Sequence, residues 1–188
     1  MMDQNTNAFL RVLDAKDNAT GGGTASSIAG AMAAGLVAMV ARLSMGKKDL
    51  APLEHYQKIA KEAEALCTEL FCGGYEDAAA FDAVTKAYQM PRDSENAKAS
   101  RSKAIQKAMH QAAEVPLSNA TRCQRILALC QSLKDSYNTN ASSDLECARH
   151  LATAGLRGCG ANVRINLPYI KDEKVCKDIE SRLKSITG

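Results

Sequence analysis

Apolar residues recur along most of the chain at intervals of three and four positions, a spacing typical of amphipathic helices rather than strands. Glycine, proline and short polar stretches separate the segments that show this spacing. Pro52 and Pro116 suit the first turn of a helix, whereas Gly73-Gly74 and Pro91 suit the end of one. The pattern predicts an all-α fold, with eight helices bundled in a single domain covering residues 1–188. The expected helical ranges are 4–16, 25–45, 52–72, 76–90, 94–114, 116–138, 143–165 and 172–186.

The segment from Thr20 to Met45 differs from the other helical segments because Ala and Gly, rather than Leu, line it. Small residues four positions apart would let neighbouring backbones approach it closely on all sides, so we expect the central helix of the bundle here. Residues 25–43 nearly reach the length of a membrane span, but Ala, Gly and Ser contribute little transfer free energy. We therefore favour a buried helix over a membrane-spanning one.

Three glycines, Gly21, Gly22 and Gly23, precede this helix and free the backbone to turn sharply, and Thr24 is placed to cap the helix. A helix that begins after such a loop directs free N–H groups and the positive end of its dipole outward. The loop is therefore a candidate binding site for an anionic part of a ligand. It lacks the Lys-Ser/Thr pair of a P-loop, which argues against nucleotide hydrolysis.

Composition narrows the classes of function. Aromatic residues make up 4% of the 188 residues and Trp is absent, which favours helices over a sheet, and a net charge of +3 is too small to indicate nucleic-acid binding. The seven cysteines include no CxxC pair and no Cys/His pair at zinc spacing, so we expect no structural metal. Without a secretory signal pattern we expect reduced thiols in the cytoplasm, with Cys123 and Cys130 as core residues.

Two acids stand on an Ala-rich helical segment with an aromatic residue between them. Burial there would raise the pKa of Asp77 or Asp82, which makes them candidates for proton transfer. Five helical positions separate their directions by about 140°, so we do not expect both in one pocket. The alternatives are that Asp77 only favours the start of a helix and that Asp82 only pairs with Lys86 four residues on.

Polar residues also mark one stripe of the late apolar helix. Asp144 and Asn162 are eighteen residues apart, or five full turns, and Asn166 follows on the same side. The ends of the stripe would lie about 27 Å apart, so an elongated ligand or a second subunit is needed if both ends bind. Alternatively the two asparagines satisfy backbone groups near the helix end. No strand precedes the string Gly155-x-x-Gly158-x-Gly160, so we interpret it as close helix packing rather than a dinucleotide loop.

Several short motifs occur in order along nearly the whole chain and together resemble the formiminotransferase-cyclodeaminase C-terminal family. They are Gly21-Gly22-Gly23-Thr24-Ala25, Gly46-Lys47-Lys48, Asp77-Ala-Ala-Ala-Phe81-Asp82-Ala-Val84, Ser143-Asp144-Leu145 and Gly160-Ala161-Asn162-Val163-Arg-Ile165-Asn166-Leu167. The resemblance implies an all-α fold that forms a homodimer. It also implies an enzyme acting on a one-carbon derivative of tetrahydrofolate, with no cofactor beyond that substrate. Members either close 5-formiminotetrahydrofolate to 5,10-methenyltetrahydrofolate with release of ammonia or act as methenyltetrahydrofolate cyclohydrolases.

The resemblance also suggests a role for each motif. Asp77, which matches the acid of the family motif, would shuttle a proton, with Asp82 as the second choice. The glycines Gly21, Gly22 and Gly23 with Thr24 would hold an anionic or carbonyl part of the folate. Asp144 would bond the pterin ring, and Asn162 and Asn166 would orient polar edges. Lys47, Lys48 and the region of Arg101 would pair with the glutamate tail.

Three departures from the family pattern leave the choice between the two substrates open. Ala19-Thr20 stands where the family often has a proline, Thr24 replaces a serine, and Met90-Pro91-Arg92 replaces Leu-Pro-Lys. None of them removes a candidate acid. Two alternatives to an enzyme are a folate-binding module without turnover and a purely structural helical dimer.

Overall fold

The computed structural model describes residues 20–188, so the helix expected at residues 4–16 lies outside the described residues. Over residues 20–188 the chain is all α-helical, without strands, as the sequence pattern predicts. The described part contains five α-helices and two short 3₁₀ turns. These are α2 (Gly22–Ser44), α3 (Leu53–Gln89), α4 (Glu95–Leu133), η1 (Thr139–Ala141), α5 (Ser142–Asn166), η2 (Leu167–Tyr169) and α6 (Glu173–Thr187).

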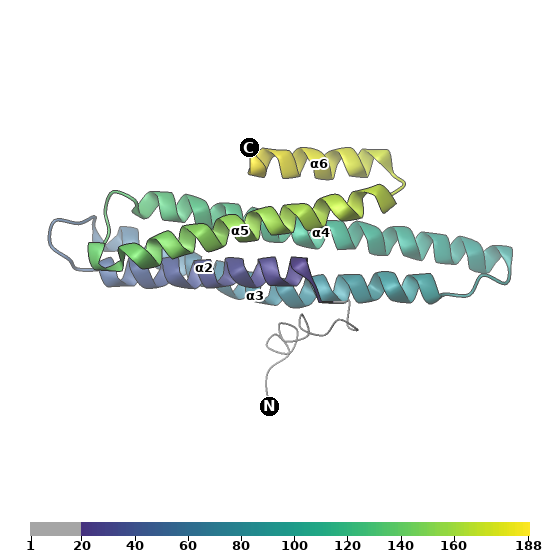
Figure 1. The fold of residues 1–188 in the computed structure, drawn as a ribbon, viewed down its shortest axis with the longest axis horizontal. Helices are drawn as coiled ribbons and strands as arrows, with labels where there is room; N and C mark the ends of the chain where they lie inside the picture. The colour runs from purple at the N-terminus through teal and green to yellow at the C-terminus, as the bar shows by residue number, and fades with distance from the viewer. Residues whose placement is uncertain (1–19) are drawn as a thin grey trace, which may run out of the picture.

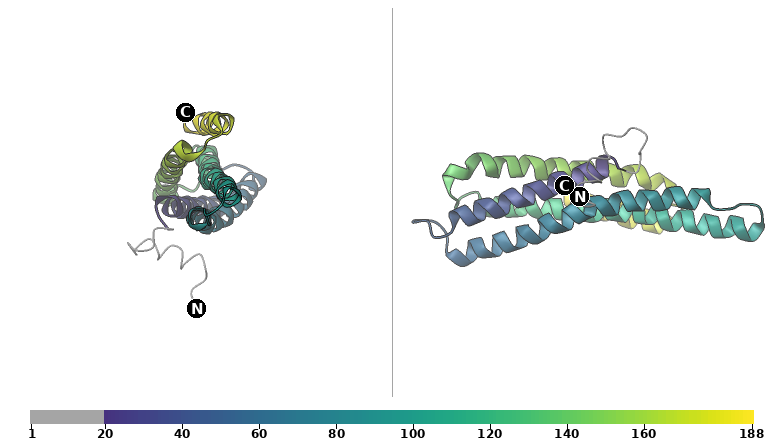
Figure 2. Two further views of the ribbon diagram at one scale, coloured as in Figure 1. Left: turned by 90° about the vertical axis from the view of Figure 1, so that its right-hand side faces the viewer. Right: turned by 90° about the horizontal axis from the view of Figure 1, so that it is seen from below.

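Helices α2 to α5 form an elongated bundle, and α6 lies outside it along α4 and α5 (Figures 1 and 2). The two longest helices, α3 and α4, continue past the beginning of α2 as an antiparallel hairpin (Figure 1). Helix α2 packs against α3, α4 and α5, in keeping with the central position expected for it. Its packing is not close on all sides, however, because Met32, Met39 and Leu43 lie on an exposed face.

Small residues bring α2 and α5 together. A Cβ atom on Gly155 would lie 2.9 Å from the carbonyl oxygen of Ser26 and 3.2 Å from the backbone nitrogen of Gly30, and a Cβ atom on Gly158 would overlap the Ser26 hydroxyl. The buried Cys123 thiol of α4 fills the space beside Gly30 and Gly155. The interpretation of the late glycines as a close helix contact is therefore confirmed.

By length and composition α2 could also cross a membrane, and 56% of its most apolar window is buried inside the protein. A core helix passes the same test, so the composition of α2 does not decide between the two.

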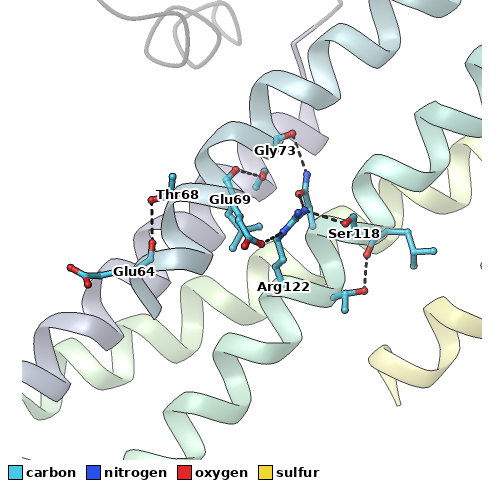
Figure 3. Close-up of polar contacts among 11 residues, drawn as sticks. Glu64, Thr68, Glu69, Gly73, Ser118 and Arg122 are labelled. Atoms are coloured by element: carbon cyan, nitrogen blue, oxygen red, sulfur yellow. Dashed lines mark hydrogen bonds and ion pairs between the residues drawn. The ribbon is translucent and has the colours of Figure 1, made fainter. Parts of the chain in front are cut away.

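The helix end predicted at Gly73-Gly74 is wrong, because α3 runs without a break through both residues. A side chain on Gly73 would collide with Asn119 of α4, whose Nδ2 donates a hydrogen bond to the Gly73 carbonyl oxygen at 3.2 Å. Arg122 supports this contact by donating to Asn119 Oδ1 at 3.1 Å and by pairing with Glu69 at 2.7 Å (Figure 3). The glycines therefore allow α3 and α4 to approach closely rather than ending a helix.

The helix start predicted at Pro116 is wrong for a related reason. Pro116 lies in the interior of the continuous helix α4 and is fully buried. A proline has no N–H, so the carbonyl of Ala112, four residues earlier, loses its usual partner within the helix. The side chain of Asn166 takes that place, since its Nδ2 donates to the Ala112 oxygen at 2.9 Å. Tertiary contact thus compensates for the missing helical hydrogen bond.

Candidate active site

A small cavity lies where the beginning of α2 meets α3, α4 and the end of α5. Its volume is about 150 Å³, and three of the motifs singled out in the sequence contribute to its wall. The lining residues are Gly21, Asp77, Phe81, Ala112, Asn162, Ile165 and Asn166. The fold therefore brings together Gly21, Asp77, Asn162 and Asn166, which lie up to 145 positions apart in the sequence, the difference between positions 21 and 166.

Asp77 is the titratable group among the residues that line this cavity. Burial raises the pKa of its carboxyl from 3.8 to about 6, while hydrogen bonds from the hydroxyl and backbone N–H of Thr24 act in the opposite direction. The interpretation of Asp77 as a residue at the start of a helix is wrong, because it lies deep inside α3. A carboxyl with this pKa exchanges a proton readily near neutral pH, as a general acid or base must.

Thr24 links Asp77 to the backbone of α3. Its hydroxyl lies 3.1 Å from the Gly74 carbonyl oxygen and 3.2 Å from Asp77 Oδ2, and it has one proton to share between these acceptors. When Asp77 is protonated, its O–H can donate to the Thr24 oxygen, and the threonine proton is then free for Gly74. Thr24 does not cap α2 through its side chain as expected, since α2 begins at Gly22 after Gly21.

Of the three glycines before α2, Gly23 serves close approach rather than a sharp turn, whereas a Cβ atom on either of the other two would meet no atom within 4 Å. Within residues 20–188 positive φ angles occur only at Gly46, Asp49 and Gly188, and not at the three glycines. A Cβ atom on Gly23 would lie 2.5 Å from both carboxylate oxygens of Asp77 and 2.6 Å from Asn162 Nδ2. Asp77 and Asn162 therefore lie directly against the first turn of α2, at the positive end of its dipole.

The two asparagines form the opposite wall and hold each other in place. Asn166 Nδ2 donates to the backbone oxygen of Asn162 at 3.0 Å and to its side-chain oxygen at 3.2 Å, in addition to the Ala112 oxygen. The alternative interpretation, that an asparagine here satisfies backbone groups, is thus correct for Asn166. Asn162 Nδ2 lies beside Gly23 and Asp77, so its amide stays available to orient a ligand.

Three other candidates do not reach this cavity within one subunit. Asp82 is half-buried on α3 and does not line the cavity, and within residues 20–188 it forms no ion pair with Lys86. Lys47 is exposed in the turn after α2, and Asp144 lies in the first turn of α5. Both are at the opposite end of α2, which is about 35 Å long. The roles suggested for these residues stay predictions.

Among the contributors that sequence reasoning missed, two come from α4. Ala112 lines the cavity, and Pro116 frees the Ala112 carbonyl for Asn166. The only signal in the sequence is a proline inside a long run of helix-forming residues, and this signal alone predicts a helix start. Cys123 and Cys130 are buried as expected, and in the described part of the chain no group of three or more His, Cys, Asp or Glu side chains is placed to hold a metal ion.

Comparison with known proteins connects this site to a family. A family model described as formiminotransferase-cyclodeaminase matches residues 5–185. The methenyltetrahydrofolate cyclohydrolase of Methylorubrum extorquens is 35% identical over 96% of this chain and 86% of its own length. The formimidoyltransferase-cyclodeaminase of Rattus norvegicus is 27% identical over 99% of this chain, which spans only 35% of that longer protein.

The crystal structure of formiminotetrahydrofolate cyclodeaminase from Thermotoga maritima has a similar fold. It matches with a TM-score of 0.84 and 29% identity, over 95% of this chain and 86% of that one. The family match therefore extends over the helices that form the cavity as well as over the sequence motifs that line it. The chain belongs to the formiminotransferase-cyclodeaminase family.

Proposed function

We propose that this folate one-carbon enzyme acts on 5,10-methenyltetrahydrofolate at the Asp77 cavity and hydrolyses it to 10-formyltetrahydrofolate. The observation that carries the proposal is the partly buried Asp77 carboxyl, whose pKa is raised to about 6 and which lies against the first turn of α2 beside Asn162. The similarity to the cyclohydrolase of Methylorubrum extorquens, which is matched over most of its length, supports this choice of reaction.

The reaction requires a base that accepts a proton from water and an acid that delivers a proton to N5. Water attacks the cationic carbon between N5 and N10, and the ionised Asp77 accepts a proton from that water. The resulting hydroxyl intermediate then collapses: the bond from carbon to N5 breaks, Asp77 returns its proton to N5, and the hydroxyl proton leaves to solvent as the formyl C=O forms. The balance is methenyl cation plus water giving 10-formyltetrahydrofolate and one proton.

Other groups around the cavity suit the same steps. The hydrogen bonds from Thr24 keep the pKa of Asp77 from rising further, so that the carboxyl still ionises near neutral pH. Asn162 presents an amide beside Asp77 that can hydrogen-bond the oxygen developing on the one-carbon unit. These positions support the proposal of proton transfer by Asp77 and of orientation by Asn162.

A second candidate is cyclodeamination of 5-formiminotetrahydrofolate, which the similarity to the Thermotoga maritima cyclodeaminase favours. In that reaction N10 attacks the formimino carbon and gives up its proton, and ammonia leaves with a proton. The same carboxyl can serve both transfers, because both reactions pass through a tetrahedral carbon between N5 and N10. The choice between them depends on whether water or ammonia is exchanged at that carbon.

The test is to mix the purified protein separately with each substrate and follow the absorbance of the methenyl group against a protein-free control. Loss of the signal from 5,10-methenyltetrahydrofolate, without activity on the formimino compound, would support the cyclohydrolase. Appearance of the signal from 5-formiminotetrahydrofolate, with ammonia released, would support the cyclodeaminase. Binding of the folate without either change would contradict both and favour a binding module.

We also propose that two copies of the chain pair through the exposed face of α2. Met32, Met39 and Leu43 recur there at helical spacing and are each more than a third exposed, which is unusual for large apolar side chains on one stripe. A two-fold axis across this stripe would set the two α2 helices antiparallel. The end of one α2, with Lys47, would then approach the beginning of the other, where the Asp77 cavity lies.

Substitution Met39→Glu places a charge in this stripe and tests the pairing. We expect sedimentation of the wild-type chain as a dimer and of the variant as a monomer with unchanged helix content. A wild-type chain that sediments as a monomer at all concentrations would contradict the proposed pairing.

A further inference from the structure

A second hollow continues from the Asp77 cavity along α3 towards the end of that helix. Its volume is about 530 Å³, and it shares Phe81, Ile165 and Asn166 with the wall of the cavity. We call it the tyrosine groove and define it by Phe81, Val84, Tyr88, Met109, Ile165 and Tyr169. The groove and the cavity therefore adjoin each other across these shared side chains.

The groove is lined by large apolar side chains that are exposed to solvent. Phe81 and Tyr88 come from α3, Ile165 from α5 and Tyr169 from η2, and their exposed fractions lie between 37% and 68%. Exposed apolar side chains that converge from separate elements are typical of a binding site. Two tyrosines and a phenylalanine suit an aromatic ring, since such rings pack against one another edge to face or offset.

Gln106 of α4 fixes the segment that carries Tyr169, so hydrogen bonds within the protein hold one wall of the groove. The Gln106 Nε2 donates to the carbonyl oxygen of Tyr169 at 3.1 Å, and its Oε1 accepts from the backbone N–H of Lys171 at 2.7 Å. Both halves of one amide are thus used to hold the turn after α5 against α4. A preformed wall reduces the entropy cost of binding.

A cation lies at the outer end of the groove. The Arg101 guanidinium lies 5.5 Å from the centre of the Tyr88 ring, and its Nε and Nη2 donate to the Tyr88 carbonyl oxygen at 3.2 and 3.0 Å. These contacts orient the guanidinium and use two of its five N–H groups, so three donors remain for a carboxylate.

The order of these features along α3 matches the order of groups in a folate. Asp77 and Tyr88 are eleven residues apart on one helix, or about 16 Å along its axis. A folate carries its reactive carbon, its aminobenzoyl ring and its glutamate in this sequence along an extended molecule. With the reactive carbon at Asp77, the ring falls in the groove and the glutamate carboxylate falls towards Arg101.

We propose that the tyrosine groove binds the aminobenzoyl ring of the folate substrate and that Arg101 binds its glutamate carboxylate. This inference rests on the proposed folate reaction and specifies how that substrate is held. It assigns Tyr88 and Arg101 to substrate binding, whereas the proton transfer belongs to Asp77.

The first test measures binding of substrate fragments, which does not depend on turnover. The probes are p-aminobenzoyl-L-glutamate and the uncharged p-aminobenzamide, titrated by NMR into the wild-type chain and its variants. We expect Tyr88→Ala to weaken both probes at least fivefold and Arg101→Ala to weaken only the glutamate probe. Matched controls are Tyr75→Ala, an equally exposed tyrosine of α3 outside both hollows, and Lys103→Ala, an exposed cation of α4. Equal affinity of each probe for Tyr88→Ala and Tyr75→Ala would overturn the assignment of the groove.

The second test separates the groove from the chemistry through steady-state kinetics with the methenyl substrate. We expect Tyr88→Ala to raise KM at least tenfold with little change in kcat, and Tyr88→Phe to restore KM because it keeps the ring. Unchanged KM in an active Tyr88→Ala enzyme would overturn the inference while leaving the proposed function intact. Fragment binding to a wild-type chain without turnover would support the groove and contradict the proposed function. A change of oligomeric state in Tyr88→Ala with unchanged KM would mean that the groove joins two copies of the chain. That result would also overturn the inference that the groove binds the substrate.

Discussion

Replacing Asp77 with asparagine should make the protein more stable while abolishing its activity. The carboxyl is partly buried and its pKa is raised to about 6, which means that the folded state disfavours its ionised form. Asparagine has almost the same shape, carries no charge, and keeps an oxygen that can accept the hydrogen bond from Thr24. The substitution therefore removes the cost of burying a charge without removing the packing.

The size of this effect follows from linkage. Between pH 3.8 and about 6 the folded state binds more protons at Asp77 than the unfolded state does, so wild-type stability falls as pH rises through this range. Because the pKa of Asp77 rises from 3.8 to about 6 on folding, its protonated carboxyl contributes about 3 kcal/mol to the free energy of unfolding at low pH. This contribution is lost as the pH rises above 6. Roughly 2 kcal/mol of this contribution should be lost between pH 4 and pH 8.

The assay is urea unfolding of wild type and Asp77→Asn at pH 4 and pH 8, followed by circular dichroism. We expect the difference in free energy of unfolding to shift by about 2 kcal/mol in favour of the variant at the higher pH. Glu76→Gln removes an exposed negative charge from the adjacent position and serves as the control, with a much smaller shift. The same difference for Asp77→Asn at both pH values would refute the claim that burial raises the pKa of Asp77.

Three further predictions concern the surroundings of this carboxyl. Gly23→Ala should lower kcat/KM and destabilise the fold by about 1–3 kcal/mol, because the added Cβ would overlap Asp77; urea unfolding and steady-state kinetics measure both. Thr24→Val removes a hydrogen bond that lowers the pKa of Asp77, so the acidic limb of the pH profile of kcat/KM should move to higher pH, and stability should fall by about 1 kcal/mol. Pro116→Ala restores a helical N–H that competes with Asn166 for its carbonyl partner, so kcat/KM should fall about tenfold by steady-state kinetics while thermal unfolding shows no loss of stability.

Controls for these variants come from the same elements. Gly22→Ala adds a Cβ with no atom within 4 Å and should leave stability and kcat/KM close to wild type. A Thr24→Ser variant keeps the hydroxyl and should keep the pH profile. Wild-type kinetics for Gly23→Ala, or an unmoved acidic limb for Thr24→Val, would contradict the geometry on which the site rests.

The helical pattern predicted most of the fold, and the errors share one physical cause. Backbone preferences alone favour a helix end at Gly73-Gly74 and a helix start at Pro116. In the folded chain Asn119 packs against Gly73, and Asn166 bonds the carbonyl that Pro116 leaves free. Contacts between distant segments outweigh these local preferences, and sequence spacing does not reveal such contacts.

The site could be predicted only in part for a similar reason. The fold brings Gly21, Asp77 and Asn162, which the motif resemblance singles out, to one cavity, and Gly23 lies against the two polar side chains. Lys47 and Asp144 belong to the same set of motifs, yet they lie at the other end of α2 within one subunit. The helical spacing of Asp144 and Asn162 already predicts that the two residues lie far apart within one subunit. It contains no information about the position of a second subunit.

The most direct test of the proposed chemistry is the turnover of 5,10-methenyltetrahydrofolate by wild type and Asp77→Asn, with the absorbance of the methenyl group followed across pH 5 to 8. If Asp77 carries the proton, the wild-type kcat/KM should fall about tenfold per pH unit below pH 6, and the variant should lose at least a hundredfold at pH 7 while staying folded. A folded variant with a near-normal rate, or a wild-type profile without this acidic limb, would contradict the assignment of proton transfer to Asp77.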